Sequence, residues 1–168
     1  MTDKLVNIIG QNLVAIGLYT VAFESMVLSF RAQMYGHLQR TSPTDAEVFS
    51  DRHCNTADQT FKYCTPKLLN HGILTDPDVQ LLNTVRKRRN HFAHAGYNEM
   101  LTLQIKDVDA DVVLMHKITG KVERWRQDLR PDNPDGSRSF SISPAIFGLY
   151  RNAAIELAAT KLVVDDAP

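Results

Sequence analysis

Three side chains whose types suit chemistry on a phosphate group lie close together in the sequence: Arg89, Asn90 and His94. A guanidinium offers fixed hydrogen-bond donors to phosphate oxygens, and a neutral imidazole exchanges a proton near physiological pH. RNA supplies its own nucleophile, the ribose 2′-hydroxyl, so a histidine that acts on it needs no metal ion. The arginine would stabilise the negative charge of the transition state, and Asn90 would hold the imidazole or contact the phosphate. If these residues are catalytic, they predict metal-independent cleavage of RNA.

The segment that contains these residues, Thr75 to Tyr97, is predicted to form one helix with marked ends. Asp76 and Pro77 open it, because a short acceptor side chain caps unpaired amides and proline fits the first position. Gly96 closes it, because glycine readily takes the left-handed conformation beyond a helix end. At 100° per residue, the predicted buried stripe of this helix consists of Leu82, Val85, Phe92 and Ala93.

Arg89 falls near the middle of this stripe, where an apolar residue would be expected. A charge at the edge of a core needs a partner, because uncompensated burial costs several kcal/mol or more. Glu24 is the only charged residue between Lys4 and Arg31. It is either a carboxylate that orients Arg89 or His94, or a structural or solvated residue beside Arg31. We predict the pairing of Glu24 with Arg89, and a cost of roughly 3–5 kcal/mol for breaking a buried pair.

Arg89 and His94 point 140° apart around an ideal helix, so one subunit does not easily bring both to one phosphate. Either the long arginine side chain curls round, or each residue serves a site that a second subunit completes. Arg86 is the rival phosphate ligand, because it shares the flank of His94. Arg86, Lys87 and Arg88 form a basic run and are the candidate substrate-binding residues, although such a run is as commonly a solvated helix face.

The pattern Arg89-Asn90-x-x-x-His94 resembles the arginine–four-residue–histidine motif of the HEPN superfamily, in which a small polar residue follows the arginine. Many members of that family are metal-independent ribonucleases of toxin–antitoxin, abortive-infection and other defence systems. The resemblance in fold covers most of the chain, whereas the specific residues cover only this stretch. Arg88 also fits the spacing but lacks the small polar residue. His91, the alternative histidine, points nearly opposite to Arg89, as a solvated or interface residue would.

The resemblance implies a fold, partners and two alternative functions. The fold is a mainly α, HEPN-like helical bundle, and the partners are RNA and a second copy of the chain whose motif completes a composite site. The alternative function is a non-catalytic RNA-binding or scaffold module. Whether an antitoxin or other neutralising partner exists stays open. Tyr97 is a supporting candidate, although its His94-x-x-Tyr97 spacing departs from the His-x-Tyr extension of one toxin branch.

Length and composition favour one domain over residues 1–168, large enough to bury a core. The 19 Lys and Arg residues balance the 19 Asp and Glu residues, so the net charge indicates no polyanion partner and argues mildly against strong RNA affinity. Cys54 and Cys64 make no disulfide framework, which favours a reducing, cytoplasmic setting. The histidines and cysteines lack ligand-type spacing, so we expect neither a metal nor a cofactor.

The apolar segment from about Asp3 to Leu38 is long enough to cross a membrane. Against a membrane span stand four polar residues distributed through it: Asn7, Gln11, Asn12 and Glu24. A signal peptide is not predicted either, because the segment lacks a convincing charged start and a convincing small-residue cleavage site. Apolar residues on nearly every face are typical of a helix at the centre of a bundle or at a subunit interface. We therefore predict a long core helix, no membrane, and a homodimer.

Shorter helices are predicted to begin at Ser42-Pro43, to cover residues 56–70 with a kink or break at Pro66, and to begin again at Ser143-Pro144. Between the last two helices, an insertion over about 99–142 is predicted to contain a small antiparallel β element.

The β prediction depends on two patterns. Leu101, Leu103 and Ile105 alternate with polar residues, which favours a strand. The runs 112–115 and 121–125 flank Thr119-Gly120, a plausible hairpin turn.

Overall fold

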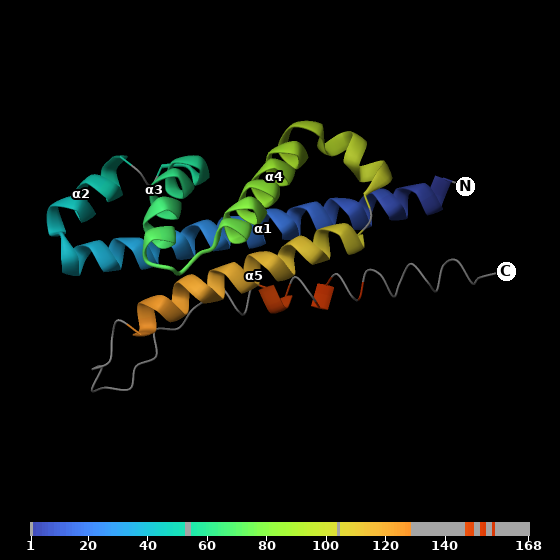
Figure 1. Ribbon diagram of the computed structural model, residues 1–168. Helices are drawn as coiled ribbons and strands as arrows, with labels where there is room; N and C mark the ends of the chain where they lie inside the picture. Colours follow the sequence, from blue (N-terminus) through green and yellow to red (C-terminus); the bar gives the residue numbers. More distant parts are fainter. Residues whose placement is uncertain are drawn as a thin grey trace.

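The computed structural model describes residues 2–52, 55–103, 105–128, 147–149, 152–153 and 156. Over these residues the protein is mainly helical, as the sequence predicts (Figure 1). Its long elements are α1 (Thr2–Thr41), α2 (Pro43–Arg52), α3 (Ala57–Asn70), α4 (Asp76–Thr102) and α5 (Ile105–Asp128). The described residues from 147 onwards are helical too, and Phe147 is buried in a stack against His116 of α5.

The long helix α1 is the axis of the bundle, and each of the other four helices packs against it. Hydrogen bonds join Tyr19 to Asp111 and, further along both helices, Ser29 to Glu123. The helices α1 and α5 therefore run side by side in the same direction (Figure 1), and α4 contacts both of them. This arrangement brings α4, which carries the motif, against the middle of α1.

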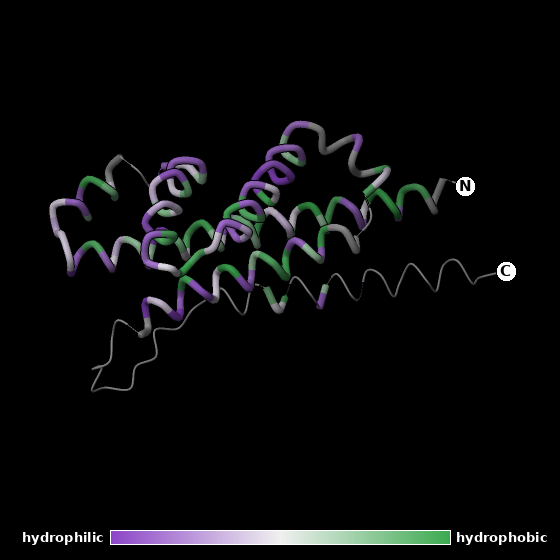
Figure 2. Tube along the Cα trace, viewed as in Figure 1, coloured by the Kyte–Doolittle hydropathy of each residue, from purple (hydrophilic) through white to green (hydrophobic). Residues whose placement is uncertain are grey.

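The core is formed by one face of α1 and the apolar stripes of the helices that cover it. Phe23 and Phe30 contact the same ring, Phe61 of α3, with ring centroids 6.0 and 5.4 Å apart. Edge-to-face contacts of this kind add roughly 0.5–1.5 kcal/mol each beyond the burial of apolar area. The apolar residues of α1 are visible along its length in Figure 2.

The opposite face of α1 is exposed, although it is also apolar. The prediction of a helix with apolar residues on nearly every face is confirmed, but only one side of it lies in the core. By length and hydropathy, Leu5–Thr41 could also cross a membrane, with 39% of its most apolar window buried. That is weak evidence, because the core helix of a soluble protein meets the same criterion.

The predicted strands within residues 101–125 are wrong, because α4 continues to Thr102 and α5 covers Ile105–Asp128. Residues 129–142 of the predicted insertion lie outside the described residues. The helix of α5 presents one apolar stripe to α1, formed by Val108, Val112, Met115, Ile118, Val122 and Trp125. This stripe has helical periodicity, and its burial outweighs the strand preference of the short β-branched runs.

Two local predictions about proline and glycine are corrected as well. The helix α3 continues through Pro66 without a break. The helix α4 continues past Gly96, and the only described glycine with a positive φ is Gly72, which follows the end of α3. Glycine inside a helix costs about 1 kcal/mol relative to alanine, which packing of a long helix can offset.

Candidate functional site

The basic run of residues 86–89 lies in the middle of α4, and its side chains diverge around the helix. Successive residues are rotated by 100°, so four neighbours face four directions. Arg86 reaches α3, Arg88 reaches α5, Arg89 reaches α1, and Lys87 is exposed. The run is therefore not one continuous basic patch. Arg86 and Arg89 reach α3 and α1, whereas Arg88 reaches α5 on another side of α4.

Arg89 forms the ion pair that the sequence predicts. Its Nη2 donates to Oε1 of Glu24 at 2.8 Å, and its guanidinium carbon lies 5.7 Å from the centroid of the Phe23 ring. The two charged side chains are 34% and 44% exposed. The predicted cost of 3–5 kcal/mol is therefore too high, because a pair exposed to this degree contributes about 1 kcal/mol or less. The Nε of Arg89 is buried and has no hydrogen-bond partner among the described residues.

The other motif residues are less closely held. Asn90 accepts from Nη1 of Arg89 at 3.5 Å, which is at the limit for a hydrogen bond. His94 is exposed, and no hydrogen bond or ion pair joins it to another described residue. The structure thus brings together Arg89, Asn90 and Glu24 but not His94. Tyr97 lies within α4, and its side chain lies outside the described residues.

Arg88 and Arg86 have different surroundings. Arg88 donates to Oδ2 of Asp111 at 3.0 Å, and this buried carboxylate also accepts from the hydroxyl of Tyr19 at 3.1 Å. Arg88 is therefore a structural contact between α4 and α5. Arg86 donates to Oδ1 of Asp58 at 3.2 Å, and that aspartate is 63% exposed. A surface pair of this kind is easily exchanged for another anion, so Arg86 is the better substrate-binding candidate.

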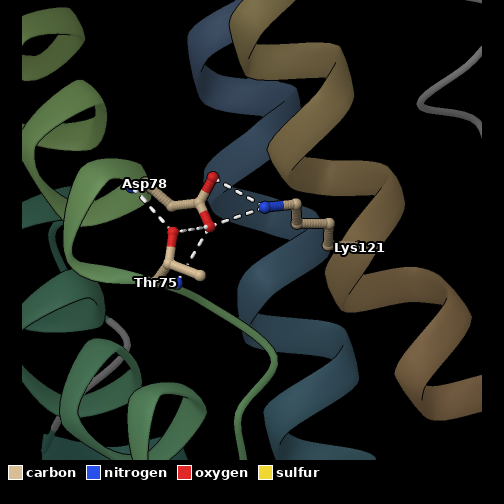
Figure 3. Close-up of polar contacts among 3 residues, drawn as sticks. All are labelled: Thr75, Asp78 and Lys121. Atoms are coloured by element: carbon tan, nitrogen blue, oxygen red, sulfur yellow. Dashed lines mark hydrogen bonds and ion pairs between the residues drawn. The ribbon is translucent and has the colours of Figure 1, made fainter.

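The start of α4 is fixed by a polar cluster (Figure 3). The backbone carbonyl of Thr75 accepts the first helical hydrogen bond, so Thr75 is the cap, one residue before the predicted Asp76. Asp78 accepts from the backbone amide and hydroxyl of Thr75 at 2.9 and 2.8 Å, in the manner of a capping box. Lys121 of α5 reaches both carboxylate oxygens of Asp78, at 2.8 and 2.6 Å. This cluster locks α4 to α5 and so fixes the position of the motif.

The pKa of Asp78 reflects this arrangement. Burial alone would raise the pKa of the carboxyl, but hydrogen bonds from Lys121 and Thr75 favour the ionised form more strongly. The pKa therefore lies below its ordinary value. The carboxyl group of Asp78 is thus ionised at neutral pH.

Family models, curated proteins and solved structures give no match to this chain.

Sequence reasoning did not select Arg31, which the structure places on the same face of α1 as Glu24. Its Nε donates to the hydroxyl of Thr60 at 2.9 Å. The signal in the sequence was the spacing of seven residues from Glu24, which puts both on one stripe. In the part of the chain that the structure describes, no group of three or more histidines, cysteines or carboxylates is close enough to hold a metal ion.

Proposed function

We propose that the chain is a metal-independent endoribonuclease of the HEPN type, with Arg89, Asn90 and His94 as its catalytic residues. The observation that carries this proposal is the ion pair between the motif arginine and Glu24 of the facing helix. The pair fixes the guanidinium at a half-exposed position, and Nη1 has no described contact besides the long one to Asn90. A phosphate oxygen can therefore accept from Nη1 without displacing Glu24.

The proposed reaction needs only groups of the protein and of RNA. His94 takes the proton of the ribose 2′-hydroxyl, and the freed oxygen attacks the adjacent phosphorus. The bond from phosphorus to the 5′-oxygen of the next nucleotide breaks, and that oxygen takes up a proton from water, while His94 releases its proton to the solvent. The products are a 2′,3′-cyclic phosphate and a 5′-hydroxyl. Arg89 stabilises the negative charge on the phosphoryl oxygens during the attack.

A second copy of the chain is part of the proposal, because Arg89 and His94 of one chain make no contact with each other. An exposed apolar stripe on α1 supports it: Val14, Val21, Leu28 and Tyr35 recur every seven residues and are 36–59% exposed. Seven-residue spacing is the pattern of helices that pack along a seam.

The stripe is also complementary to itself. If two α1 helices pack antiparallel about a point between Glu24 and Ser25, the pairs of facing residues are Val14 with Tyr35 and Val21 with Leu28. A two-fold interface requires this kind of self-complementarity. Gly17 has open space around the position of a Cβ, which would permit close approach of a second helix. In this register the two Arg89–Glu24 pairs would lie on either side of the two-fold axis.

The proposal places the protein in the cytoplasm, in a toxin–antitoxin or phage-defence system, and an antitoxin would be a further partner. The alternative is a non-catalytic RNA-binding or scaffold module. Its support is that His94 stands apart from Arg89 in the single chain and that the net charge is zero.

The decisive experiment is an RNA cleavage assay in EDTA. The purified protein should cut single-stranded RNA and leave DNA of the same sequence intact, because DNA lacks the 2′-hydroxyl. His94→Ala should abolish cleavage while leaving RNA binding largely intact, and Arg89→Ala should reduce both. Arg124→Ala, which removes an exposed arginine of α5, is the matched control. A wild-type protein that binds RNA but cleaves none across a broad substrate panel would establish the scaffold module instead.

A further inference from the structure

The Nε of Arg31 forms a hydrogen bond, whereas its two terminal nitrogens remain available to a ligand. Arg31 lies on α1 two turns beyond Glu24, and its Nε donates to Oγ1 of Thr60 at 2.9 Å. Among the described residues, its two terminal nitrogens form no hydrogen bond or ion pair. A guanidinium has five N–H donors, so this contact leaves at least four of them for another acceptor.

The acceptor that holds Arg31 is itself fixed. Thr60 is fully buried, and its hydroxyl donates to the backbone carbonyl of Thr56 at 2.8 Å. The helix orients the hydroxyl of Thr60. The guanidinium of Arg31, which donates to that hydroxyl, is therefore held in one orientation. A planar guanidinium with a defined direction loses less side-chain entropy when it binds an anion.

Arg31 and Arg86 both reach α3, at the junction of α1, α3 and α4. Arg31 reaches Thr60 of α3, and Arg86 reaches Asp58, which lies two residues earlier on α3. Arg89 contacts Glu24, which lies roughly 10 Å from Arg31 along α1 at 1.5 Å per residue. Arg31 and Arg86 therefore both reach the first turns of α3, and Arg89 lies one turn further along α4 against Glu24 of α1.

The charges of this junction favour an anion. Arg31, Arg86 and Arg89 carry three positive charges, and Glu24 and Asp58 carry two negative ones. Asp58 is largely exposed, so its effect is screened by solvent. The amino-terminal end of α3 adds a partial positive charge from its backbone amides.

We propose that Arg31 binds a phosphate of single-stranded RNA next to the one that is cleaved. The RNA backbone then follows the track from Arg89 past Arg86 to Arg31, over the beginning of α3. Arg31 thus replaces Arg88 as a candidate substrate-binding residue, because Arg88 forms an ion pair with Asp111. This inference rests on the proposed ribonuclease function and extends its substrate site.

The test measures RNA binding as a function of salt. The probe is a fluorescent single-stranded 2′-O-methyl RNA of about ten nucleotides, which lacks the nucleophile and stays intact. Arg31→Ala should weaken binding about fivefold at low salt, the change for one lost exposed ion pair. It should also lower the slope of log K against log salt concentration by about 0.7, the value for one phosphate contact of a single strand. Arg31→Lys should keep most of the slope, and Arg124→Ala should change neither quantity.

Cleavage kinetics separate this role from a structural one. Because Arg31 does not touch the reacting phosphate, Arg31→Ala should raise KM and leave kcat nearly unchanged. Light scattering and thermal unfolding check that the oligomeric state and the fold are retained. If wild type binds RNA and Arg31→Ala keeps its affinity and salt slope, the Arg31 inference is wrong and the ribonuclease proposal stands. If wild type neither binds nor cleaves RNA, the proposed function fails and the inference fails with it.

Discussion

Nη2 of Arg89 donates to Oε1 of Glu24 at 2.8 Å, across the contact between α1 and α4. We expect Glu24→Gln to lower the rate of RNA cleavage, because a neutral amide holds the guanidinium less firmly. The free energy of unfolding should fall by only about 1 kcal/mol, since both side chains are a third or more exposed. Cleavage assays and urea denaturation measure the two effects. Glu47→Gln, an exposed glutamate of α2, is the control; full activity in Glu24→Gln would leave Glu24 with a structural role only.

Asp58 competes with RNA for Arg86. We expect Asp58→Asn to tighten RNA binding by about two- to fivefold at low salt, because it releases Arg86 and removes a negative charge near the substrate track. Fluorescence anisotropy with the 2′-O-methyl RNA measures the change. Asp45→Asn makes the same charge change on the exposed surface of α2 and should have a smaller effect. Weaker binding in Asp58→Asn would exclude Arg86 as a phosphate ligand.

The exposed stripe on α1 predicts a homodimer that a single charge can disrupt. Val21 and Leu28 are 52% and 59% exposed in the single chain. Val21→Asp should therefore leave the fold intact and shift the protein from dimer to monomer, because the charge would be buried in the interface. Light scattering at micromolar concentration measures the mass. Val113→Asp on α5, 49% exposed, is the matched control. A monomeric wild-type protein would refute both the dimer and the composite site.

The contacts of Asp78 with Lys121 and Thr75 should contribute strongly to the free energy of unfolding, and this contribution should be lost in acid. Asp78→Ala removes the contact of the capping box with Thr75 and leaves Lys121 without its Asp78 partner, so we expect a loss of roughly 2–4 kcal/mol in unfolding free energy. Asp76→Ala, an exposed acid in the same turn, should cost at most about 0.5 kcal/mol.

The pH dependence of this contribution has a definite sign. The native pKa of Asp78 is lowered, so its stabilising effect is complete above the unfolded-state pKa of about 4. It is lost as the pH falls below that value and through the native pKa. Urea denaturation of wild type and Asp78→Ala should therefore converge on acidification below pH ~4. Parallel curves over that range would show that the carboxylate is not held in its charged form.

His37 should lower stability at mildly acidic pH. Burial first, and then the charges of His71, Arg40, Arg126 and Lys67, lower the pKa of its imidazole below the ordinary value. The unfolded state then binds more protons, so stability falls as the pH drops below about 6.5, the unfolded-state value. His37→Gln should flatten this part of the curve of unfolding free energy against pH. His94→Gln removes an exposed histidine and should leave the drop in place; the same drop in His37→Gln would assign it to another group.

Helices whose first residues are marked by a capping residue and a proline are predictable from the sequence. Ser42 precedes the start of α2 and its carbonyl accepts the first helical hydrogen bond, as its sequence with Pro43 predicts. Glu24 is isolated in an apolar helix and Arg89 in an apolar stripe, and the pattern predicts that they pair, because an isolated charge at the edge of a core needs an opposite charge.

The sequence determined that the chain is mainly helical and that α1 is its long apolar helix, and it made Glu24 the preferred partner of Arg89. Only the tertiary structure decided that residues 105–125 are helical, because the burial of one stripe against α1 outweighs the strand preference of short segments. It also decided which of the arginines face the site. Rotation by 100° per residue sends Arg88 to Asp111, and the packing of α1 against α3 joins Arg31 to Thr60. The spacing of seven residues puts Arg31 on the stripe of Glu24, but its contact with Thr60 of α3 depends on how the helices pack.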